Sequence, residues 1–369
     1  MKKTADFSPH ILVVTGFSDI AEAHMFIGLA QRGCKISIIS EPGAKFNEAF
    51  AAAGMDVIPL KIKGRFDRAA RTRIRALCIE KKIQLVHAMN NRAVANALAA
   101  TKGLKLRFIA YRGIEGNDSY WDPLSWQTYL HPRVDRVICV ADAIRRFLVG
   151  LSLLGYRQPA SKFITIYKGH DLAWYNQPRT DLTEFGVPQD AFVIGSVAND
   201  RPRKGIPLLV EAFNQLSALP QAHLVLVGSM ESPALQQQIT ASPFAERIHY
   251  LGQRQDAPSL MSACDVYVLP AIKREGLPKT VIEAMAYGRV PVVTASGGSP
   301  ELIEEGISGL IVPPGDVHAL SQSLLKLASM SANEREQMGL AAQQRLVKCF
   351  HTQDTVTKTR QVYQELLAL

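Results

Sequence analysis

The feature that most constrains this chain is a regular alternation of short, β-branched apolar runs with longer amphipathic stretches, which occurs twice along the sequence. The short runs predict strands, and the stretches with apolar residues every three or four positions predict helices. Because the runs are apolar throughout, we expect parallel strands that are buried on both faces. In the first half, the predicted strands are 11–15, 35–40, 57–60, 85–88, 108–111 and 136–140, and the predicted helices are 20–32, 66–82, 93–101 and 141–149.

The alternation restarts after residue 190, so the sequence predicts an α/β chain with two doubly wound units. The intervening stretch contains Gly169, Pro178, Gly186 and Pro188, which are typical of turns and linkers. In the second half, the predicted strands are 192–197, 223–227, 248–250, 266–269, 290–294 and 310–312, and the predicted helices are 206–217, 257–263, 278–287, 317–329 and 356–369.

Composition limits the class of protein. A chain of 369 residues with 47% apolar and 20% charged residues can fill two cores, which excludes a disordered or fibrous protein. Its five cysteines form no CxxC pair, so we predict neither a disulfide framework nor a cysteine zinc site, and a cytosolic compartment fits. The N terminus lacks a signal-peptide core, and no stretch reaches the ~20 apolar residues of a membrane span.

Charge is divided unevenly along the chain. Residues 1–180 contain 27 Lys and Arg against 14 Asp and Glu, whereas residues 181–369 contain 15 against 19. The basic half can attract a phosphorylated acceptor or anionic lipid headgroups. The acidic half argues against one continuous nucleic-acid groove, so we predict no nucleic-acid partner.

The most informative segment is 273–286, which reads KREGLPKTVIEAMA. Pro278 suits the first helical position, and Leu277 before it offers no side-chain cap, so the first-turn amides remain available to an anion. Glu275 and Glu283 lie one or two helical turns apart, so one can hold a sugar and the other a ribose. A capless helix with two solvated glutamates is the alternative interpretation.

This segment resembles the E-x7-E signature of retaining GT-B glycosyltransferases of the family 4 type (glycosyltransferase group 1), with Glu275 and Glu283 as its glutamates. The blocks 286–294 and 297–302 resemble the next part of that family, and the order of blocks agrees over nearly the whole chain. The resemblance implies two Rossmann-like domains that face an interdomain cleft. These would be an acceptor domain at 1–172, a linker at 173–190, a nucleotide-sugar-binding domain at 191–351 and a C-terminal helix at 352–369 that returns to the first domain.

By resemblance, Glu275 contacts the donor sugar near its reacting carbon, and Glu283 binds the ribose hydroxyls. A carboxylate suits both roles because it accepts hydrogen bonds from two vicinal hydroxyls. The backbone around Gly276 and Leu277 would border the diphosphate of the donor, since a glycine allows close approach.

Two further donor-side features follow from the same resemblance. The turn at Gly297 and Gly298 would also border the diphosphate, and an ordinary loop with Ser299 as helix N-cap and Pro300 as first helical residue is compatible with it. Base recognition in such domains often uses backbone atoms, here around 250–254, so Arg254 is included among the donor-binding candidates.

A second block, 195–205, follows a predicted strand and resembles the family's diphosphate-binding loop. The resemblance implies that Lys204 acts in catalysis by neutralising the donor diphosphate and stabilising charge on the departing nucleotide. The arginine that the family usually has after this strand is Asn199 here, so Arg201 or Arg203 is expected to supply its charge. Solvated basic residues at a helix start are the alternative.

Four positions in the first half match the family less closely. Gly16 is the single glycine of the loop after the first strand, where a plain turn is equally compatible, and His87 is a catalytic candidate or a structural histidine at a strand end. Arg112 stands where many relatives have a histidine; it stays protonated and could hold a phosphate. Trp121 lies in an aromatic loop that suits an acceptor sugar, a membrane interface or core packing.

Basic residues also crowd the segment 63–82, where they surround Phe66, Ile74, Leu77 and Ile79. A surface helix of this kind can lie on anionic lipid, and a plain solvated face is the alternative. Charge reversal of residues such as Arg68, Arg71 and Arg75 would distinguish the two.

The resemblance implies transfer of a sugar, with retention, from a nucleotide-diphosphate sugar to a hydroxyl of a saccharide, phosphorylated or lipid-linked acceptor, in lipopolysaccharide or other envelope glycan biosynthesis. The sequence contains no DxD motif and no His-rich or Cys-rich metal spacing, so we expect metal-independent chemistry without a cofactor. We expect a cytoplasmic protein, placed at the inner face of the membrane if the basic half binds lipid. The alternatives are a nucleotide-sugar epimerase on the same fold and a non-catalytic protein that binds a nucleotide sugar or another anion.

Overall fold

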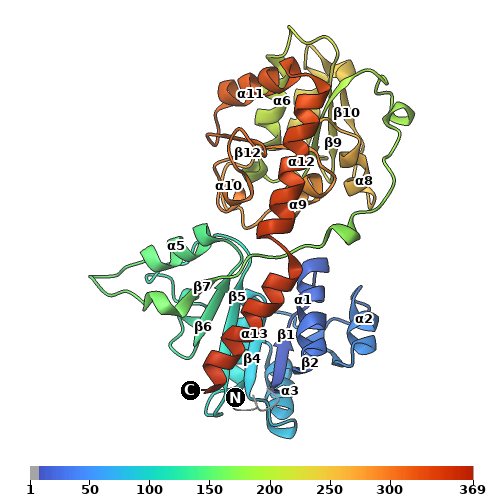
Figure 1. The fold of residues 1–369 in the computed structure, drawn as a ribbon. Helices are drawn as coiled ribbons and strands as arrows, with labels where there is room; N and C mark the ends of the chain where they lie inside the picture. The colour runs from blue at the N-terminus through green and yellow to red at the C-terminus, as the bar shows by residue number, and fades with distance from the viewer. Residues whose placement is uncertain (1–7, 369) are drawn as a thin grey trace. The chain divides into compact units, whose positions relative to one another are not determined.

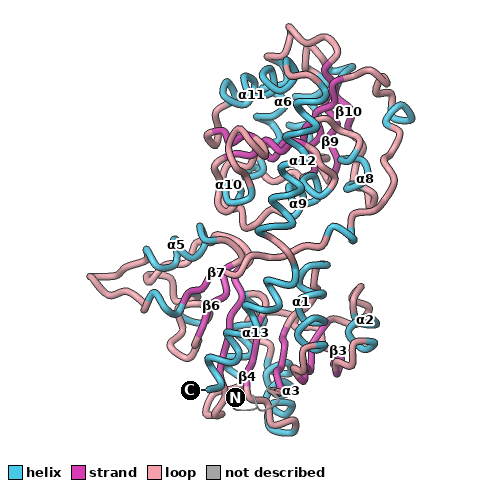
Figure 2. Tube along the Cα trace, viewed as in Figure 1, coloured by secondary structure: helices cyan, strands magenta, loops and turns pink. Residues whose placement is uncertain are grey.

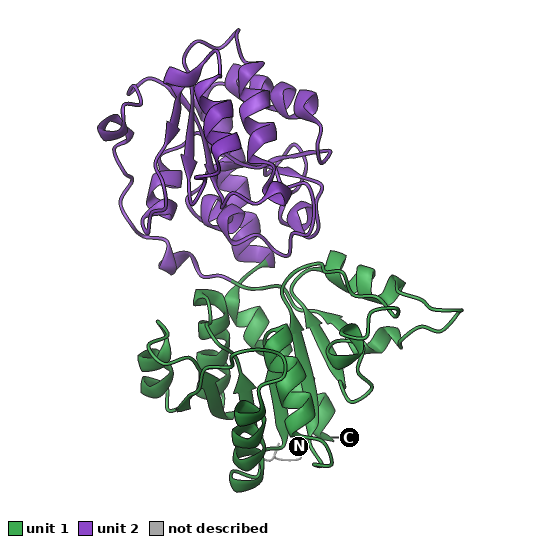
Figure 3. Cartoon of the chain, turned by 180° about the vertical axis from the view of Figure 1, so that it is seen from behind, with its two compact units in different colours: residues 1–169, 350–369 green, residues 170–349 purple. Residues whose placement is uncertain are grey.

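The computed structural model describes residues 8–368. Met1 to Phe7 and Leu369, which the sequence analysis includes in the first domain and in the last helix, lie outside the described residues. The chain divides into two compact units (Figure 3): unit 1 comprises Met1–Gly169 and Phe350–Leu369, and unit 2 comprises His170–Cys349. Each unit contains one parallel sheet with helices packed around it (Figure 2), so two doubly wound units are present, as the sequence predicts.

Unit 1 contains a seven-stranded sheet in the order β3-β2-β1-β4-β5-β6-β7, with every neighbouring pair parallel. The apolar residues of the two central strands, 11–14 in β1 and Leu85, Val86 and Ala88 in β4, have no solvent exposure, because both faces of the sheet are covered. The strands are β1 (His10–Val14), β2 (Lys35–Ser40), β3 (Asp56–Pro59), β4 (Leu85–Ala88), β5 (Arg107–Arg112), β6 (Arg136–Cys139) and β7 (Phe163–Thr165).

The helices of unit 1 include one from the far end of the chain (Figure 1). Helix α13 packs against α1, where Val356 lies on Gly28 and Arg32 donates hydrogen bonds to Thr357 and Gln353. The short strand β7 and the short helix α2 were not predicted. The helices are α1 (Ile20–Gln31), α2 (Asn47–Ala52), α3 (Arg68–Glu80), α4 (Asn91–Ala100), α5 (Asp142–Gly150) and α13 (Thr352–Ala368).

Unit 2 contains a six-stranded parallel sheet in the order β10-β9-β8-β11-β12-β13. Its strands coincide with the predicted ranges to within one residue, because each is a short apolar run between polar loops. The strands are β8 (Phe192–Val197), β9 (Ala222–Val227), β10 (Ile248–Tyr250), β11 (Val266–Leu269), β12 (Val290–Thr294) and β13 (Leu310–Val312).

Two helices of unit 2 were not predicted, α7 (Pro233–Thr240) and α12 (Ala332–Cys349), and of the short α10 (Ser299–Leu302) only a start at Ser299 and Pro300 was expected. Helix α12 is long, but it buries only Met338, Gly339, Ala342 and Leu346, so its apolar stripe is too thin to stand out in the sequence. The predicted helices of this unit are α6 (Ile206–Asn214), α8 (Ala257–Ser262), α9 (Lys279–Ala286) and α11 (Val317–Ser329).

The segment 173–190, expected as a linker, is part of unit 2. Its backbone and side chains are bonded to the region of α8: the Ser259 hydroxyl donates to the Pro178 carbonyl at 2.5 Å, and Arg179 donates to the Ala263 carbonyl at 3.0 Å. Leu182 and Val187 are buried. These contacts hold the segment on the unit rather than leaving it as a free connection.

Both sheets reverse their strand order at one place, between β1 and β4 in unit 1 and between β8 and β11 in unit 2. Ligands of open parallel sheets bind beside the carboxyl ends of the strands at such a reversal. The loops after these four strands are therefore the first places to examine for a site. Within residues 8–368, no helix is both long and apolar enough to cross a bilayer.

Candidate active site

The site of unit 2 is built from the loops that follow β8 and β11. Gly205, which ends the first loop at φ 69°, touches the other loop so closely that a Cβ there would lie 2.0 Å from the Pro270 carbonyl oxygen. The Ile272 amide donates to the Arg203 carbonyl at 2.8 Å, which joins the two loops directly. The segment 199–204 is thereby held beside the start of α9.

Glu275 collects two cations from the loop after β8. Its Oε1 accepts from Lys204 Nζ at 2.8 Å and from Arg203 Nη1 at 3.3 Å. The carboxylate is buried, whereas Lys204 and Arg203 remain partly exposed. A buried carboxylate with two partners and two cations within reach of solvent can exchange partners when an anion arrives.

The backbone that carries Glu275 is fixed by a close approach of the glycine turn after β12. Gly297 has φ 55°, and a Cβ on it would lie 2.0 Å from the Glu275 carbonyl oxygen, so only glycine fits here. The Gly298 amide donates to the Gly276 carbonyl at 3.0 Å. Arg274 itself adopts φ 62°, an uncommon conformation for a residue with a side chain. Such backbone conformations often mark functional sites.

The N terminus of α9 carries no side-chain cap, as expected, although its position differs by one residue. Pro278 is the N-cap rather than the first helical residue, and Leu277 is buried. The first-turn amides have no intrahelical acceptor, so this end of the helix favours an anion. The expectation for the next helix was also wrong in detail, because Gly298 rather than Ser299 is the N-cap of α10.

Two hydroxyl groups at the same turn were not predicted from the sequence to contact a ligand. Ser296 and Ser299 each have a buried side-chain oxygen with no hydrogen-bond partner within the described residues. A buried hydroxyl without a partner costs free energy that a bound acceptor would recover. Serine beside a Gly-Gly turn was the only signal available for them in the sequence.

Glu283 is buried in the second turn of α9, and its Oε1 pairs with Lys279 Nζ at 2.7 Å. Sequence reasoning missed Lys279, although its i, i+4 spacing from Glu283 was visible. Below the helix start, Tyr267 donates to the Thr280 hydroxyl at 2.6 Å. Burial raises the pKa of Tyr267, so this phenol stays neutral and acts as a fixed donor.

The remaining donor-side candidates are placed differently. Asn199 and Arg201 are exposed on the loop after β8, and their roles in donor binding stay predictions. Arg254 makes a two-pronged ion pair with Asp256, at 2.9 and 2.8 Å, and its guanidinium lies 4.9 Å from the centre of the Phe185 ring. That guanidinium is engaged within its own loop, so a role for Arg254 in binding the donor would rest on its backbone.

In unit 1, the loop that contains Gly16 leads into a capped helix. Asp19 and Glu22 form a capping box at the start of α1, and Lys168 Nζ bonds to both carboxylates at 2.6 and 2.8 Å. The anionic groups already present at this helix N terminus disfavour a phosphate there. Gly16 is near Glu41, whose Oε1 would lie 3.3 Å from an added Cβ, and its role in donor binding stays a prediction.

The structure argues against the catalytic role expected for His87. The ring is fully buried, and its Nδ1 lies 2.7 Å from the hydroxyl of Tyr363 in α13. The rings of Phe26 and Tyr111 surround it at 5.6 and 6.1 Å. Burial lowers the pKa of His87 to about 3, so the ring is neutral near pH 7. Burial and the bond to Tyr363 favour the structural interpretation of this histidine.

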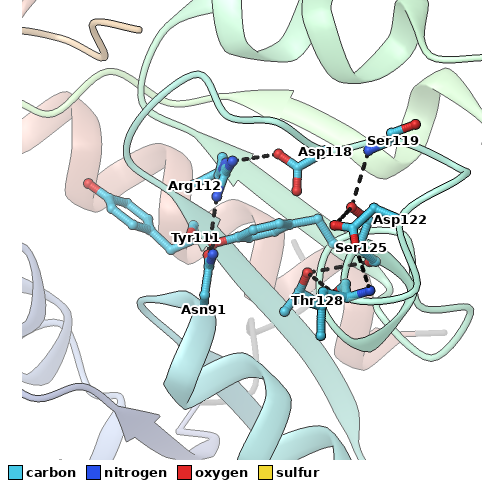
Figure 4. Close-up of polar contacts among 10 residues, drawn as sticks. Asn91, Tyr111, Arg112, Asp118, Ser119, Asp122, Ser125 and Thr128 are labelled. Carbon is cyan, nitrogen blue, oxygen red and sulfur yellow. Dashed lines mark hydrogen bonds and ion pairs between the residues drawn. The ribbon is translucent and has the colours of Figure 1, made fainter. Parts of the chain in front are cut away.

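Arg112 is also buried and occupied (Figure 4). Its Nη2 lies 2.5 Å from Asp118, its Nη1 donates to Asn91 at 3.1 Å, and its guanidinium lies 4.5 Å from the centre of the Tyr129 ring. Burial raises the pKa of Asp118, and Arg112 opposes that shift. The expected role in holding a phosphate is therefore not supported, because an internal carboxylate takes the place of the anion.

Trp121 is the one unit 1 candidate that the structure leaves largely exposed. On α3, by contrast, the arginines expected to face lipid are partly engaged: Arg71 donates to the Asn96 side chain and the Arg65 carbonyl, and Arg75 donates to the carbonyls of Ala100 and Lys102. Within residues 8–368, no group of three or more His, Cys, Asp or Glu side chains is arranged to hold a metal ion.

Comparison with known proteins agrees with this geometry. Residues 179–345 match the model described as "Glycosyl transferases group 1", and residues 23–174 match the model described as "Glycosyltransferase Family 4". A glycosyltransferase structure from Rickettsia africae superimposes on this chain with a TM-score of 0.81 at 20% identity. The superposition covers 98% of this chain and 99% of that structure, which supports the fold. The chain therefore belongs to the family 4, group 1 glycosyltransferases and has the GT-B fold.

Curated relatives are more distant in sequence. N-acetyl-alpha-D-glucosaminyl L-malate synthase of Bacillus anthracis is 24% identical over 213 residues, which is 57% of this chain and 55% of that protein. Phosphatidyl-myo-inositol mannosyltransferase of Mycolicibacterium smegmatis is 24% identical over 312 residues, which is 80% of this chain and 77% of that protein. The chain thus spans little more than half the length of the first relative and about three quarters of the second.

Proposed function

We propose that this protein transfers a sugar from a nucleotide-diphosphate sugar to a hydroxyl group of an acceptor. The observation that carries the proposal is the convergence of Lys204 and Arg203 on the buried carboxylate of Glu275, beside the uncapped N terminus of α9. Cations and free amides at one place suit a diphosphate, and a buried carboxylate between them suits sugar hydroxyls.

Donor binding requires an exchange of partners at this site. The diphosphate takes over Lys204, Arg203 and the first-turn amides of α9, and Glu275 is released to accept hydrogen bonds from the sugar. Glu283, which now pairs with Lys279, takes the vicinal hydroxyls of the ribose. Charge stabilisation by fixed groups of this kind accelerates departure of the nucleotide.

The chemical step that we propose retains the configuration at the anomeric carbon. The bond from that carbon to the leaving phosphate oxygen breaks, and a bond to the acceptor oxygen forms on the same face. The acceptor proton passes to the leaving phosphate oxygen. No divalent metal is needed in this scheme, since Lys204 and Arg203 supply the positive charge that the diphosphate requires.

For the acceptor, we propose a saccharide or a lipid-linked saccharide of the cell envelope, such as a lipopolysaccharide precursor, met at the inner face of a membrane. The basic first half of the chain supports an anionic or phosphorylated acceptor. The relative whose name states a phosphatidyl-myo-inositol acceptor supports lipid linkage.

The test is a panel of UDP-, GDP- and ADP-sugars, added without metal and followed by thermal shift and nucleotide release. We expect one donor to raise the melting temperature and to be hydrolysed slowly in the absence of acceptor. Lys204→Ala should slow release at least about 100-fold. Lys273→Ala, which changes an exposed lysine of the neighbouring loop, should behave as wild type.

Other results would point elsewhere. Conversion of a donor into its epimer without release of nucleotide would identify an epimerase. Tight donor binding without release or transfer, for every acceptor offered, would identify a non-catalytic binding protein.

A further inference from the structure

Two loops of unit 1 meet at an exposed apolar surface that glycosyl transfer does not explain. One connects β5 to β6 and contains Trp121 and Leu124; the other follows α5 and contains Leu154 and Tyr156. We call these four side chains the apolar tip. The loops are held together because the Tyr156 ring lies 5.6 Å from the Tyr120 ring, and the Tyr120 hydroxyl accepts from the Gln158 amide at 2.7 Å.

The second loop ends in a tight turn with an unusual residue at its apex. Leu153 and Tyr156 exchange two backbone hydrogen bonds, at 3.0 and 2.8 Å, so that Leu154 and Gly155 form a two-residue turn. Both central residues have positive φ, 48° and 85°. Asn, Asp or Gly normally occupies the first of these positions, because a leucine side chain is strained there.

Leu154 gains no packing within unit 1 that offsets this strain, since 97% of its surface is exposed. Trp121 is 77% exposed, and Tyr156 and Leu124 are also exposed. In Figure 1 the segment between α5 and β7 extends away from the sheet. The leucine turn, which Tyr156 follows directly, is therefore a projection and not a groove that could receive a peptide or a sugar.

Charge around the tip has one sign along the second loop. From residue 143 to residue 170 the chain contains no Asp or Glu, and Arg157 is exposed directly after Tyr156. Arg146 is exposed as well, although it pairs with Asp142 at 2.7 Å. An exposed cation beside apolar and aromatic side chains is complementary to an anionic headgroup layer.

We propose that the apolar tip inserts into the headgroup region of a bilayer that contains anionic lipid. A convex leucine turn gains burial when it enters a deformable layer, whereas a flat protein surface would leave it exposed. Trp121 and Tyr156 suit the boundary between headgroups and acyl chains, because each has an apolar body and a polar edge. We expect this contact at the tip rather than along α3, where Arg71 and Arg75 bond to the protein itself, although Arg68 and Arg73 of α3 are exposed.

The test is sedimentation of the full chain with phosphatidylcholine vesicles that contain phosphatidylglycerol. We expect the double variant Leu154→Ser/Trp121→Ser to bind at least about tenfold more weakly than wild type, because it lacks two apolar side chains that the bilayer would bury. The matched control is Ile307→Ser, which removes a similarly exposed apolar side chain from unit 2. Ile79→Ser removes an exposed side chain of α3 and should also bind as wild type.

A second readout does not depend on vesicle affinity alone. Brominated lipid should quench the tryptophan fluorescence of wild type, and Trp121→Phe should lose most of that quenching while Trp126→Phe keeps it. An unchanged melting temperature without vesicles would show that the variants fold, whatever the enzyme's acceptor proves to be.

Three results would overturn the proposal. In the first, the double variant binds the vesicles as tightly as wild type does. In the second, the wild-type protein does not bind these vesicles. The third is self-association of wild type, but not of the double variant, in sedimentation velocity without lipid, since the tip would then contact a second copy of the chain.

Discussion

The strand-order reversals of the two units carry charged residues in opposite arrangements. In unit 1, the N terminus of α1 is capped by Asp19 and Glu22, and their charge is balanced by the partly buried Lys168, which bonds to both carboxylates. In unit 2, the N terminus of α9 has no side-chain cap, and the nearby Lys204 pairs with Glu275 of the same site. The first arrangement is complete without a ligand, whereas the second has donors to offer.

The two arrangements differ in whether a charged side chain is already paired inside the protein or remains available to a ligand. A buried cation that is already paired inside the protein is not available to an external anion, as with Arg112, which bonds to Asp118 and Asn91. A partly exposed cation that shares one carboxylate oxygen with a second cation can be released by a competing anion. The same residue types therefore have different roles in the two units.

The largest effect is expected from removal of a structural charge. Arg112→Ala should lower the free energy of unfolding by about 3–5 kcal/mol, because Asp118 would be left buried without its partner. Urea unfolding measures this loss. Arg146→Ala, which breaks an exposed pair with Asp142, is the control and should cost less than about 1 kcal/mol. Wild-type stability together with lost acceptor binding in Arg112→Ala would reverse the assignment.

Removal of the functional charge should affect turnover instead. Lys204→Ala should lower donor turnover about 100-fold to 1000-fold, since one preorganised donor to the leaving group is lost. Nucleotide release gives the rate, and thermal melting confirms that the variant is folded. The comparison between the units would break down if Lys204→Ala unfolded like Arg112→Ala while retaining its activity.

A pH effect should follow from burial of the neutral His87. Its pKa of about 3 in the folded protein is below the value of about 6.5 expected in the unfolded chain. Between these two pH values the unfolded chain binds a proton on this histidine and the folded protein does not, so stability falls as the pH falls. The contribution is present in full above pH 6.5 and is lost toward pH 3. Between pH 6.5 and pH 5, wild type should lose about 2 kcal/mol more stability than His87→Gln.

Urea unfolding midpoints of wild type and His87→Gln, measured across this pH range, give the difference in stability. Parallel curves for wild type and His87→Gln would show that the ring is accessible to protons in the folded protein. The catalytic interpretation of His87 would then have to be considered again.

The smallest effect is expected for Lys279, whose pairing with Glu283 orients the carboxylate proposed to hold the ribose. Lys279→Met should change stability by less than about 0.5 kcal/mol, since the lysine is half exposed. We expect the donor KM to rise a few-fold with little change in kcat, and Lys279→Arg to restore it. An unchanged KM would show that Glu283 needs no partner to hold its position.

Most of the fold could be predicted because the signals are local. Buried parallel strands such as β8 and β12 are short apolar runs, and the α9 segment carries its own start signal in Pro278. Helix α12 was missed because four small or apolar residues hold it in place, and β7 because three residues give no period. These elements depend on what packs against them rather than on their own pattern.

The candidate site shows the same division. The motif predicts Glu275, Glu283 and Lys204 as site residues, since their spacing within two segments is characteristic of the family. It could not distinguish these from Arg112 and His87, because that distinction depends on residues elsewhere in the chain: Tyr363 for the histidine, and Asp118 across a loop for the arginine.

By itself, the sequence determined the alternation of strands and helices, the two doubly wound units and the family, because each is encoded in short-range periodicity or in a compact motif. Only the tertiary structure decided which charges are already satisfied. Lys204 meets Glu275 across 71 positions and His87 meets Tyr363 across 276, so their partners come together only when the sheets form. Burial then determines whether such a group stabilises the fold or stays available to a ligand.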